Sequence, residues 1–382
     1  MKVLHLADLH LGKRLNEFNL LEDQRYILSQ IVTIAREEEV DGVLICGDVY
    51  DKSQPSAEAF ELLDCFLTEL VAQNLQVLMI SGNHDSPERL SFGSRIMHRA
   101  GLYAAGRFQG CPERVTLEDE HGPVHFYLLP FIRPAHVRPY FEQKIESYHQ
   151  AVAAVLAAEP IKKTERNVLL AHQFVLSGEV EPERSDSETV AVGGLDSVDA
   201  SVLQDFDYVA LGHLHRAQSI GGEQIRYAGS PLKYSFSEAR HIKSVAVITL
   251  AAKGEVEIRQ RPLTPLRDLR EIRGPLAELL RLGQEAREGQ DDYFRIILTD
   301  QEELYDPLGQ LRPVYPNLMS LEFENRRTQA AEYEIAPSGD LTDQGPIDLF
   351  AGFYELQNNE QLTEEQITVL EEVFAEAGGD EP

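Results

Sequence analysis

The sequence predicts a layered α/β domain, followed by a smaller α+β unit and a helical tail. Short apolar runs alternate with segments whose apolar residues recur three and four positions apart, which is the strand–helix–strand pattern of an α/β sheet. Two prolines within residues 261–266 follow the last strand of this series and indicate a domain boundary. At 382 residues, the chain is long enough for two or three domains.

Strands of the first part are expected where β-branched residues and leucines form short continuous runs. The first three are residues 1–7, 40–46 and 75–81, and the helices between them are residues 22–38 and 57–73. Residues 182–188 are polar and unpatterned, so we expect a mobile loop there. Five further strand candidates are residues 124–130, 167–172, 208–212, 225–228 and 244–250.

The small unit that follows alternates strand and helix patterns over about sixty residues, near the lower limit of independent stability. We therefore expect it to dock on the first domain. The chain divides into residues 1–265, 266–335 and 336–382. The expected elements of the small unit are strands at residues 269–272, 293–299 and 318–323, a helix at 275–287, and a helix or turn at 306–312.

The tail carries two short helical patterns after a linker, at residues 347–356 and 363–377. Thr363 and Gln366 have the spacing of a capping box at the start of the second helix. Two short helices have little core of their own, so they either pack on the parent domain or dock to another protein. The apolar residues available for such a contact are Phe350, Phe353, Tyr354, Ile367, Leu370 and Phe374.

Charge and cysteine content narrow the class of protein. The formal net charge is −29, and residues 341–382 carry eleven acidic side chains and no Lys or Arg. This balance argues against a chain that wraps nucleic acid over a broad surface. The three cysteines form no CxxC pair, and no run of eighteen apolar residues occurs, so we expect an unexported protein of the cytoplasm without a membrane segment.

Polar residues recur at the carboxyl ends of the expected strands, the edge where open α/β sheets bind ligands. Asp8 and His10, like His213 and His215, are two positions apart, so an extended backbone would point each pair toward one place. Each element alone is a weak signal, because a histidine at a strand end is more often structural. Seven residues in this position are metal-ligand candidates: Asp8, His10, Asp48, Asn83, His172, His213 and His215.

Carboxylate, imidazole and amide oxygen without thiolate suit Mn, Fe or Zn in mixed nitrogen and oxygen sites. Seven ligands exceed what one ion with open positions needs, but two divalent ions that share Asp48 would use them all. Two such ions outweigh the carboxylates of Asp8 and Asp48 and leave the site positive. We therefore expect a centre that attracts phosphate inside an acidic protein.

The ordered set DLH, GDVYD, GNHD, the isolated His172 and GHLH resembles the calcineurin-like metallophosphoesterase superfamily. The segments ADLHLG, GDVYDKSQPS, ISGNHDS and YAGSPLKYSFSE resemble its SbcD family, the nuclease subunits of bacterial SbcCD complexes, over most of residues 1–250. The resemblance implies an αββα sandwich that carries the nuclease site, a small α+β capping domain and a C-terminal helical pair.

The resemblance also implies roles for single residues. His84 would face the scissile phosphate, with Asp85 orienting its ring, while a role for Asp51 in placing DNA is no better supported than a turn role. One metal ion would be bound by Asp8, His10, Asp48 and His215, and the other by Asp48, Asn83, His172 and His213.

The activity implied is manganese-dependent hydrolysis of DNA, as a 3′ to 5′ double-strand exonuclease and a single-strand and hairpin endonuclease in DNA end processing. The partners implied are DNA, an SbcC-type ABC ATPase that docks on the C-terminal helices, and a second copy of the chain. The dimer would use helices at residues 57–73 and 87–100.

Two other functions stay open at this point: a phosphoesterase for nucleotides or phosphoproteins, and a scaffold with an inactive site. DNA contacts are the least determined feature, because charged residues on helices usually only face solvent. A local phosphate track could comprise Lys13, Arg14, Arg89, Arg95, Arg99, Arg133, Arg138, Lys233 and Lys243.

Overall fold

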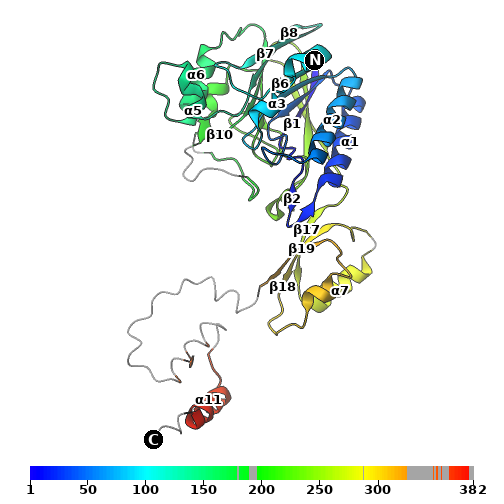
Figure 1. The fold of residues 1–382 in the computed structure, drawn as a ribbon, viewed down its shortest axis with the longest axis vertical. Coiled ribbons are helices and arrows are strands. Elements are labelled where there is room, and N and C mark those ends of the chain that lie inside the picture. The colour runs from blue at the N-terminus through cyan, green and yellow to red at the C-terminus, as the bar shows by residue number, and fades with distance from the viewer. Residues whose placement is uncertain are drawn as a thin grey trace. The chain divides into compact units, whose positions relative to one another are not determined.

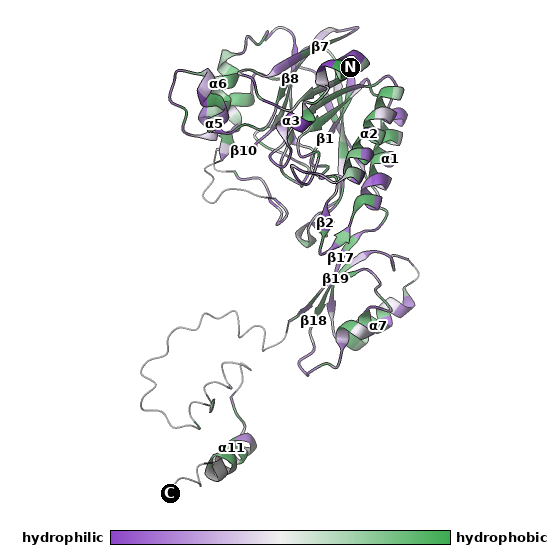
Figure 2. Ribbon diagram, in the orientation of Figure 1, coloured by the Kyte–Doolittle hydropathy of each residue, from purple (hydrophilic) through white to green (hydrophobic). Residues whose placement is uncertain are grey.

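The structure is a computed structural model that describes residues 1–178, 180–188, 196–286, 288–324, 347, 350, 351, 354 and 361–377. These residues belong to two compact units, Met1–Asp268 and Leu269–Pro382. In the first unit, two six-stranded sheets lie between helices, which gives the αββα layering expected from the resemblance (Figure 1). Figure 2 shows hydrophobic residues along the strands between the helical layers.

The first sheet places the amino-terminal strand in its middle. The neighbouring pairs β1–β4, β4–β5 and β5–β6 are parallel, while β15 pairs with β1 and β16 in antiparallel fashion. Its strands, in spatial order, are β16 (Val256–Pro262), β15 (Ser244–Leu250), β1 (Lys2–Leu6), β4 (Gly42–Cys46), β5 (Gln76–Ile80) and β6 (Leu102–Ala105).

The second sheet has a parallel centre, in which β8 pairs with β9 and β9 pairs with β12. Its strands, in spatial order, are β13 (Gln218–Ser219), β14 (Ile225–Tyr227), β12 (Tyr208–Gly212), β9 (Arg166–His172), β8 (Gly122–Leu129) and β7 (Glu113–Asp119). Small two-stranded pairs are formed by β2 (Arg14–Leu15) with β3 (Phe18–Asn19), and by β10 (Phe174–Leu176) with β11 (Ser197–Asp199).

Each central strand buries both of its faces, which explains why these strands are continuous apolar runs in the sequence. In β4, Leu44 and Cys46 pack into the core between the sheets, while Val43 and Ile45 are buried on the opposite face. Helices α1 (Leu21–Glu37) and α2 (Ala57–Ala72) accompany the first sheet. Helix α6 (Tyr148–Ala158) packs Val152 and Val155 against the second sheet.

Further helices of this unit are single turns. They are α3 (Pro87–Leu90), α4 (Ser94–Met97), α5 (Pro134–Val137) and the 3-10 helices His98–Ala100, Arg138–Tyr140, Ala200–Leu203 and Phe236–Glu238.

All eight strands expected in the first unit are present, with ends shifted by at most two residues. The edge strands β7 and β16 escape prediction because charged residues alternate along them and they are largely exposed. The segment at residues 182–188 lacks regular structure, as expected, but its last residues contact the candidate site. That this segment is mobile stays a prediction.

The second unit contains a three-stranded parallel sheet with the order β17–β18–β19. Leu279, Phe294 and Leu298 belong to its core, which Leu311 completes. Its elements are β17 (Leu269–Gly274), α7 (Leu276–Glu285), β18 (Tyr293–Leu298), α8 (Pro307–Leu311) and β19 (Leu318–Phe323), so every element expected here is present.

In the tail, α11 (Glu364–Ala377) begins with the expected capping box. The backbone N–H of Gln366 donates to Thr363 Oγ1 at 3.3 Å, and the backbone N–H of Thr363 donates to Gln366 Oε1 at 2.9 Å. The expected helix at residues 347–356 lies largely outside the described residues, as does Phe353. Phe350 and Phe374 are in ring contact at 6.4 Å between centroids. Among the helices that the structure describes, none has the length and apolar character needed to cross a bilayer.

A histidine joins the two sheets at the centre of the sandwich. His5 of β1 is fully buried, and its Nδ1 lies 2.9 Å from the hydroxyl of Tyr208 in β12. Burial lowers the pKa of His5 to about 3, so the ring is neutral in the folded chain, whereas in the unfolded chain it titrates near the usual value of about 6.5.

We therefore predict that His5 makes the metal-free protein less stable in mild acid. The contribution of the neutral His5 ring to the free energy of unfolding is complete above pH 6.5. It is lost as pH falls from 6.5 toward 3, at roughly 1.4 kcal/mol per pH unit. Urea unfolding at pH 7.5 and pH 5.5 measures this, and His5→Gln should reduce the difference between the two free energies by about 1.4 kcal/mol. The exposed His121→Gln is the matched control, and equal pH dependence in both variants would contradict the prediction.

Candidate metal centre

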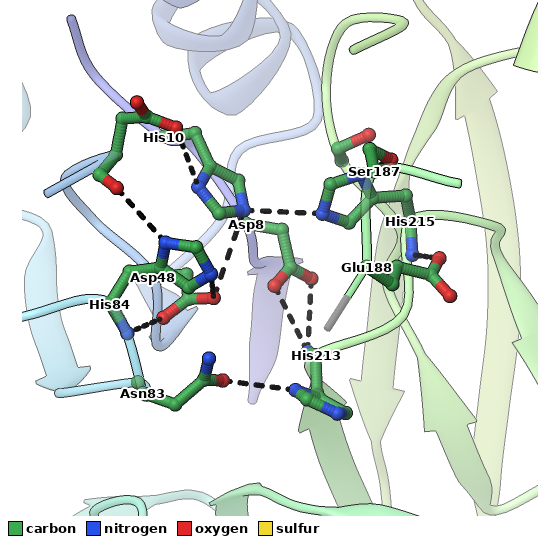
Figure 3. A network of polar contacts seen from close by, with 12 residues as sticks. Asp8, His10, Asp48, Asn83, His84, Ser187, Glu188, His213 and His215 are labelled. Atoms are coloured by element: carbon green, nitrogen blue, oxygen red, sulfur yellow. Dashed lines mark hydrogen bonds and ion pairs between the residues drawn. The ribbon is translucent and has the colours of Figure 1, made fainter. Parts of the chain in front are cut away.

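The candidate ligands come from five strands whose carboxyl ends meet at one edge of the sandwich. Asp8, Asp48 and Asn83 follow the adjacent parallel strands β1, β4 and β5 of the first sheet. His172 ends β9, and His213 follows its parallel neighbour β12 in the second sheet. The edges of both sheets therefore supply the ligands, which Figure 3 shows converging on a common space.

The expected reason for this convergence is wrong. Strands β1 and β12 end at Leu6 and Gly212, before the candidate pairs, so strand alternation does not direct these side chains. The backbone instead takes the left-handed conformation, which costs about 1–3 kcal/mol per residue and persists where packing enforces it. Among the candidate ligands, φ is positive at Asp8 (54°), His10 (43°), Asp48 (47°) and His213 (104°).

Glycines stand before three of the ligands because there is no space for a side chain. A Cβ at Gly82 would lie 2.1 Å from Asp48 Oδ1, and a Cβ at Gly212 would lie 1.9 Å from the carbonyl oxygen of Cys46. The strand ends therefore approach one another too closely for any other residue. This packing holds Asp48, Asn83 and His213 in fixed positions.

One group of ligand atoms is formed by Asp8, His10 and His215, whose donor atoms lie within 4.8 Å of one another. The two ring nitrogens His10 Nε2 and His215 Nε2 face each other at 3.1 Å. Both rings are almost completely buried. A cation between them would satisfy both lone pairs.

A second group is formed by Asp8, Asp48 and His172, again with donor atoms within 4.8 Å of one another. Asn83 extends this group, since its Oδ1 lies 3.1 Å from His172 Nε2 and 3.0 Å from His213 Nδ1. Asp48 Oδ2 is 3.3 Å from His172 Nε2 and 3.7 Å from His10 Nε2. Asp48 is therefore close to ligand atoms of both groups, and Asp8 belongs to both.

The buried carboxylates of these two groups need positive charge nearby. Burial raises the pKa of Asp8 well above its usual value; His172 opposes this shift and Asp48 adds to it. Burial also disfavours the ionised Asp48, but His172 and His10 outweigh it and hold the pKa of Asp48 well below its usual value. Burial likewise opposes protonation of His172, yet Asp48 raises the pKa of that ring to about 9. In the metal-free chain, protons provide the charge that cations would otherwise supply.

The rings of His213 and His215 are neutral at physiological pH. Burial lowers the pKa of His213 to about 3 and that of His215 to about 4. The His172 Nδ1 lies 2.8 Å from the carbonyl oxygen of Cys46, so it carries a hydrogen, and Nε2 points at Asp48 and Asn83. Unprotonated nitrogens and carboxylates gathered without thiolate are a donor set that fits divalent cations such as Mn²⁺.

His84 differs from the other rings in exposure, since 26% of its side chain is accessible against 0% for His172 and 1% for His10. Its backbone N–H donates to Asp48 Oδ1 at 2.8 Å, and its Nδ1 lies 2.9 Å from the carbonyl oxygen of Asp51. Because a carbonyl can only accept, Nδ1 carries a hydrogen, and Nε2 is the nitrogen that can gain or lose a proton.

The expectation that Asp85 orients the ring of His84 is wrong, because the backbone of Asp51 does this. The carboxylate of Asp85 accepts three backbone N–H groups instead, from Gly82 at 2.8 Å, Tyr50 at 2.9 Å and Val49 at 3.1 Å. Burial raises the pKa of Asp85 to about 6, with Asp48 adding to the shift. Asp85 therefore ties the loop after β4 to the loop after β5.

The side chain of Asp51 also has a structural contact, because it pairs with Lys13 at 2.9 Å. It lies 3.6 Å from His10 Nδ1 as well. Burial opposes ionisation of Asp51, but His10 and Lys13 lower its pKa to about 2. The turn role of Asp51 and its role in placing DNA both stay predictions.

Several polar residues around His215 are not evident from their spacing in the sequence. Ser187 and Glu188 come from the segment expected only as a loop, while Glu238 and Lys243 lie in and after the YAGSPLKYSFSE motif. Lys243 is 7% exposed and donates to Glu238 Oε2 at 2.5 Å, so its expected place in a phosphate track is wrong. Glu238 is the last residue of that motif, but nothing in its spacing relates it to His215.

Comparisons with known proteins show which family the chain resembles. Residues 1–217 match the family model of the calcineurin-like phosphoesterases, and residues 265–358 match the SbcD_C model, described as the Type 5 capsule protein repressor C-terminal domain.

Two curated relatives cover nearly the whole chain. The SbcD subunit of the SbcCD nuclease from Staphylococcus epidermidis is 34% identical over 374 residues, 96% of each chain. The SbcD subunit of the same nuclease from Staphylococcus saprophyticus is 33% identical over 380 residues, 98% of each chain. Among solved structures, a dimetal phosphatase from Danio rerio aligns with TM-score 0.43 and 16% identity, over 69% of this chain and 96% of its own.

We predict that Asp85→Asn destabilises the metal-free protein and weakens its binding of Mn²⁺. The two carboxylate oxygens of Asp85 accept three backbone N–H groups, whereas an asparagine side chain has only one oxygen. A buried N–H therefore loses its acceptor, at a cost of about 1–3 kcal/mol. Urea unfolding and calorimetric titration with Mn²⁺ measure the two effects. Asp64→Asn, on the exposed face of α2, is the matched control, and equal stability of the two variants would show that Asp85 does not tie the loops.

Proposed function

The chain belongs to the calcineurin-like phosphoesterase family and, within it, to the SbcD family of nuclease subunits, and on this basis we propose that it hydrolyses phosphodiester bonds of DNA with two bound divalent cations. The observation that carries the proposal is the pair of buried ligand groups, Asp8 with His10 and His215 and Asp8 with Asp48 and His172, of which Asp48 also lies 3.7 Å from His10 Nε2 and beside the accessible ring of His84. Mn²⁺ is the proposed ion.

The ligand atoms divide naturally between two cations. Such ions, when bound, polarise the phosphate and lower the pKa of a water molecule, which supplies the nucleophile. Asp48 Oδ2 lies 3.3 Å from His172 Nε2 and 3.7 Å from His10 Nε2, so Asp48 is proposed as the shared ligand. One cation is assigned to Asp8, His10, Asp48 and His215, and the second to Asp48, Asn83, His172 and His213.

His84 is proposed to act on the substrate rather than on a cation. Asp51 and Asp48 hold its Nδ1 and its backbone, so the ring is positioned from both sides. Its Nε2 is 4.0 Å from Asp48 Oδ2, within reach of a group bound at the centre. From there it can stabilise the charge on the phosphate or give a proton to the leaving oxygen.

Substrate and partners follow from the relatives. The SbcCD names of the relatives lead us to propose DNA as substrate and an SbcC-type ATPase as partner, with the chain acting in DNA end processing in the cytoplasm. Exonuclease action from 3′ to 5′ on duplex ends, and endonuclease action on hairpins and single strands, are part of this proposal. Residues 266–335 are proposed as the capping domain and residues 336–382 as the linker and helices that dock on the ATPase, with Ile367, Leu370 and Phe374 on the apolar face of the last helix.

We predict that His84→Ala keeps both Mn²⁺ ions but loses hydrolysis by a factor of about 10² to 10⁴, because general acid catalysis supplies that much. A labelled DNA hairpin incubated with the protein and Mn²⁺ measures cleavage, and elemental analysis measures the metal content. His121→Ala, on an exposed turn, is the control. Parent-like cleavage by the His84 variant would remove this residue from the mechanism, and activity on small phosphodiesters without any on DNA would favour the alternative phosphoesterase.

A homodimer is proposed through the segment at residues 87–100 together with α2. Two large apolar side chains of this segment, Phe92 and Ile96, are 85% and 78% exposed, which is costly unless another surface covers them. We predict that the parent chain is a dimer of 43.0 kDa subunits and that Phe92→Glu with Ile96→Glu makes it a monomer in light scattering. Ile242→Glu, at a site equally exposed at 82%, should leave the dimer intact. A dimeric double variant would refute this interface.

A further inference from the structure

One candidate ligand, His215, has a hydrogen-bond partner at every polar atom that does not face the other ligands. Figure 3 shows Ser187 and Glu188 beside it. Its backbone N–H donates to Glu188 Oε1 at 2.6 Å, and its carbonyl oxygen accepts from Lys243 Nζ at 2.8 Å. Its Nδ1 lies 2.8 Å from Ser187 Oγ and 3.2 Å from Glu238 Oε1. The ring therefore has no freedom to rotate away from the centre.

The carboxylate behind the ring is a buried ion. Glu238 is 0% exposed, and Lys243, at 7%, is its counterion. Burying such a pair is expensive unless other groups complete its hydrogen bonds. Here Lys243 Nζ also donates to Ser230 Oγ at 2.9 Å, and Glu238 Oε1 accepts the Ser187 hydroxyl at 2.6 Å. A paired and hydrogen-bonded carboxylate therefore lies next to His215.

The hydrogen bonds determine which nitrogen of His215 carries the hydrogen. Because the Ser187 hydroxyl donates to Glu238, its oxygen is free to accept from the ring, and the Glu238 carboxylate can only accept. The Nδ1 of His215 is therefore the donor. The lone pair stays on Nε2, which faces His10 Nε2 at 3.1 Å, where a cation would be bound.

His10, the other ring of this group, lacks comparable support. Its Nδ1 is buried and has no hydrogen-bond partner within the described part of the chain, and Asp51 Oδ1 is 3.6 Å away. The two rings that face each other thus differ in how firmly their tautomers are fixed. The charged support is concentrated on His215.

The segment that brings Ser187 to the ring is itself attached to the chain after His215. Glu183 pairs with Arg216, and its backbone N–H and carbonyl oxygen bond the side chain of Gln218 at 2.9 and 2.8 Å. The Asp186 N–H donates to Ser237 Oγ at 3.0 Å. Residues 183–188 therefore form a strap across the segments that carry His215 and Glu238.

We propose that Glu238, together with Ser187, is a positioning residue that fixes the tautomer of His215 and strengthens it as a ligand of one of the two cations. The inference rests on the proposed two-cation function. A carboxylate hydrogen-bonded to the far nitrogen of a ligand imidazole makes the ring a better electron donor, and loss of such a partner lowers metal affinity by roughly 10- to 100-fold. Lys243 keeps the carboxylate charged in its buried position.

The test is Mn²⁺ binding by the full chain with Glu238→Gln, followed by electron paramagnetic resonance of free Mn²⁺. We expect one of the two ions to bind roughly 10- to 100-fold more weakly and the other to bind as in the parent. Glu38→Gln is the matched control, because Glu38 is a similarly enclosed carboxylate that pairs with Arg259 and Arg261 away from the centre. This control should lower the unfolding midpoint and leave both Mn²⁺ affinities unchanged.

A second variant keeps the test decisive if Glu238→Gln does not fold. Ser187→Ala removes the hydrogen bonds of this hydroxyl with His215 and Glu238 from a partly exposed position and should weaken binding of the same ion by roughly fivefold. The inference is overturned if a folded Glu238→Gln variant binds both Mn²⁺ ions with unchanged affinity. If only Ser187→Ala folds, unchanged affinities in that variant overturn it. So does an Nε2–H tautomer of His215 in the ¹⁵N spectrum of the metal-free parent. A parent that binds no Mn²⁺ refutes the proposed function itself.

Discussion

The structure depends on one electrostatic constraint, which is that buried carboxylates and imidazoles at the seam of two sheets need positive charge between them. Asp8 and Asp48 are both nearly inaccessible, and they share their surroundings with the rings of His10 and His172. Two carboxylates this close cannot both ionise without protons or cations nearby. Divalent cations would meet this requirement and, as proposed, would leave a local positive charge for a phosphate in a chain whose own charge is −29.

The fold brings these groups together through backbone conformations that are themselves destabilising at a few positions. Left-handed turns after β1, β4 and β12 aim the ligands, and glycines let the strand ends come together. Asp85 then ties two of the loops through three backbone hydrogen bonds. On the other side, Glu238 and Lys243 join His215 to the segment that follows β14. The core between the sheets makes these positions rigid, since strained turns survive only where packing leaves no alternative.

The sequence predicts much of this arrangement, because buried parallel strands are apolar on both faces and are followed by polar turns. The strands that carry Asp8, Asp48 and His172 are therefore visible as apolar runs. Spacing alone predicts the wrong local geometry for Asp8 and His10, because φ sign is a property of tertiary packing. Glu238 and Ser187 could not be placed, since they reach His215 from 23 and 28 residues away in the chain, through contacts that no periodicity encodes.

Crystals of the full chain soaked in Mn²⁺, measured at the manganese absorption edge, test the two-cation picture most directly. A centre that shares Asp48 between two cations requires two anomalous peaks about 3.5–4 Å apart, one on each side of that carboxylate. It also requires His215 Nε2, and not Nδ1, to face one of the peaks. A single peak, or two peaks of which neither touches Asp48, would contradict it.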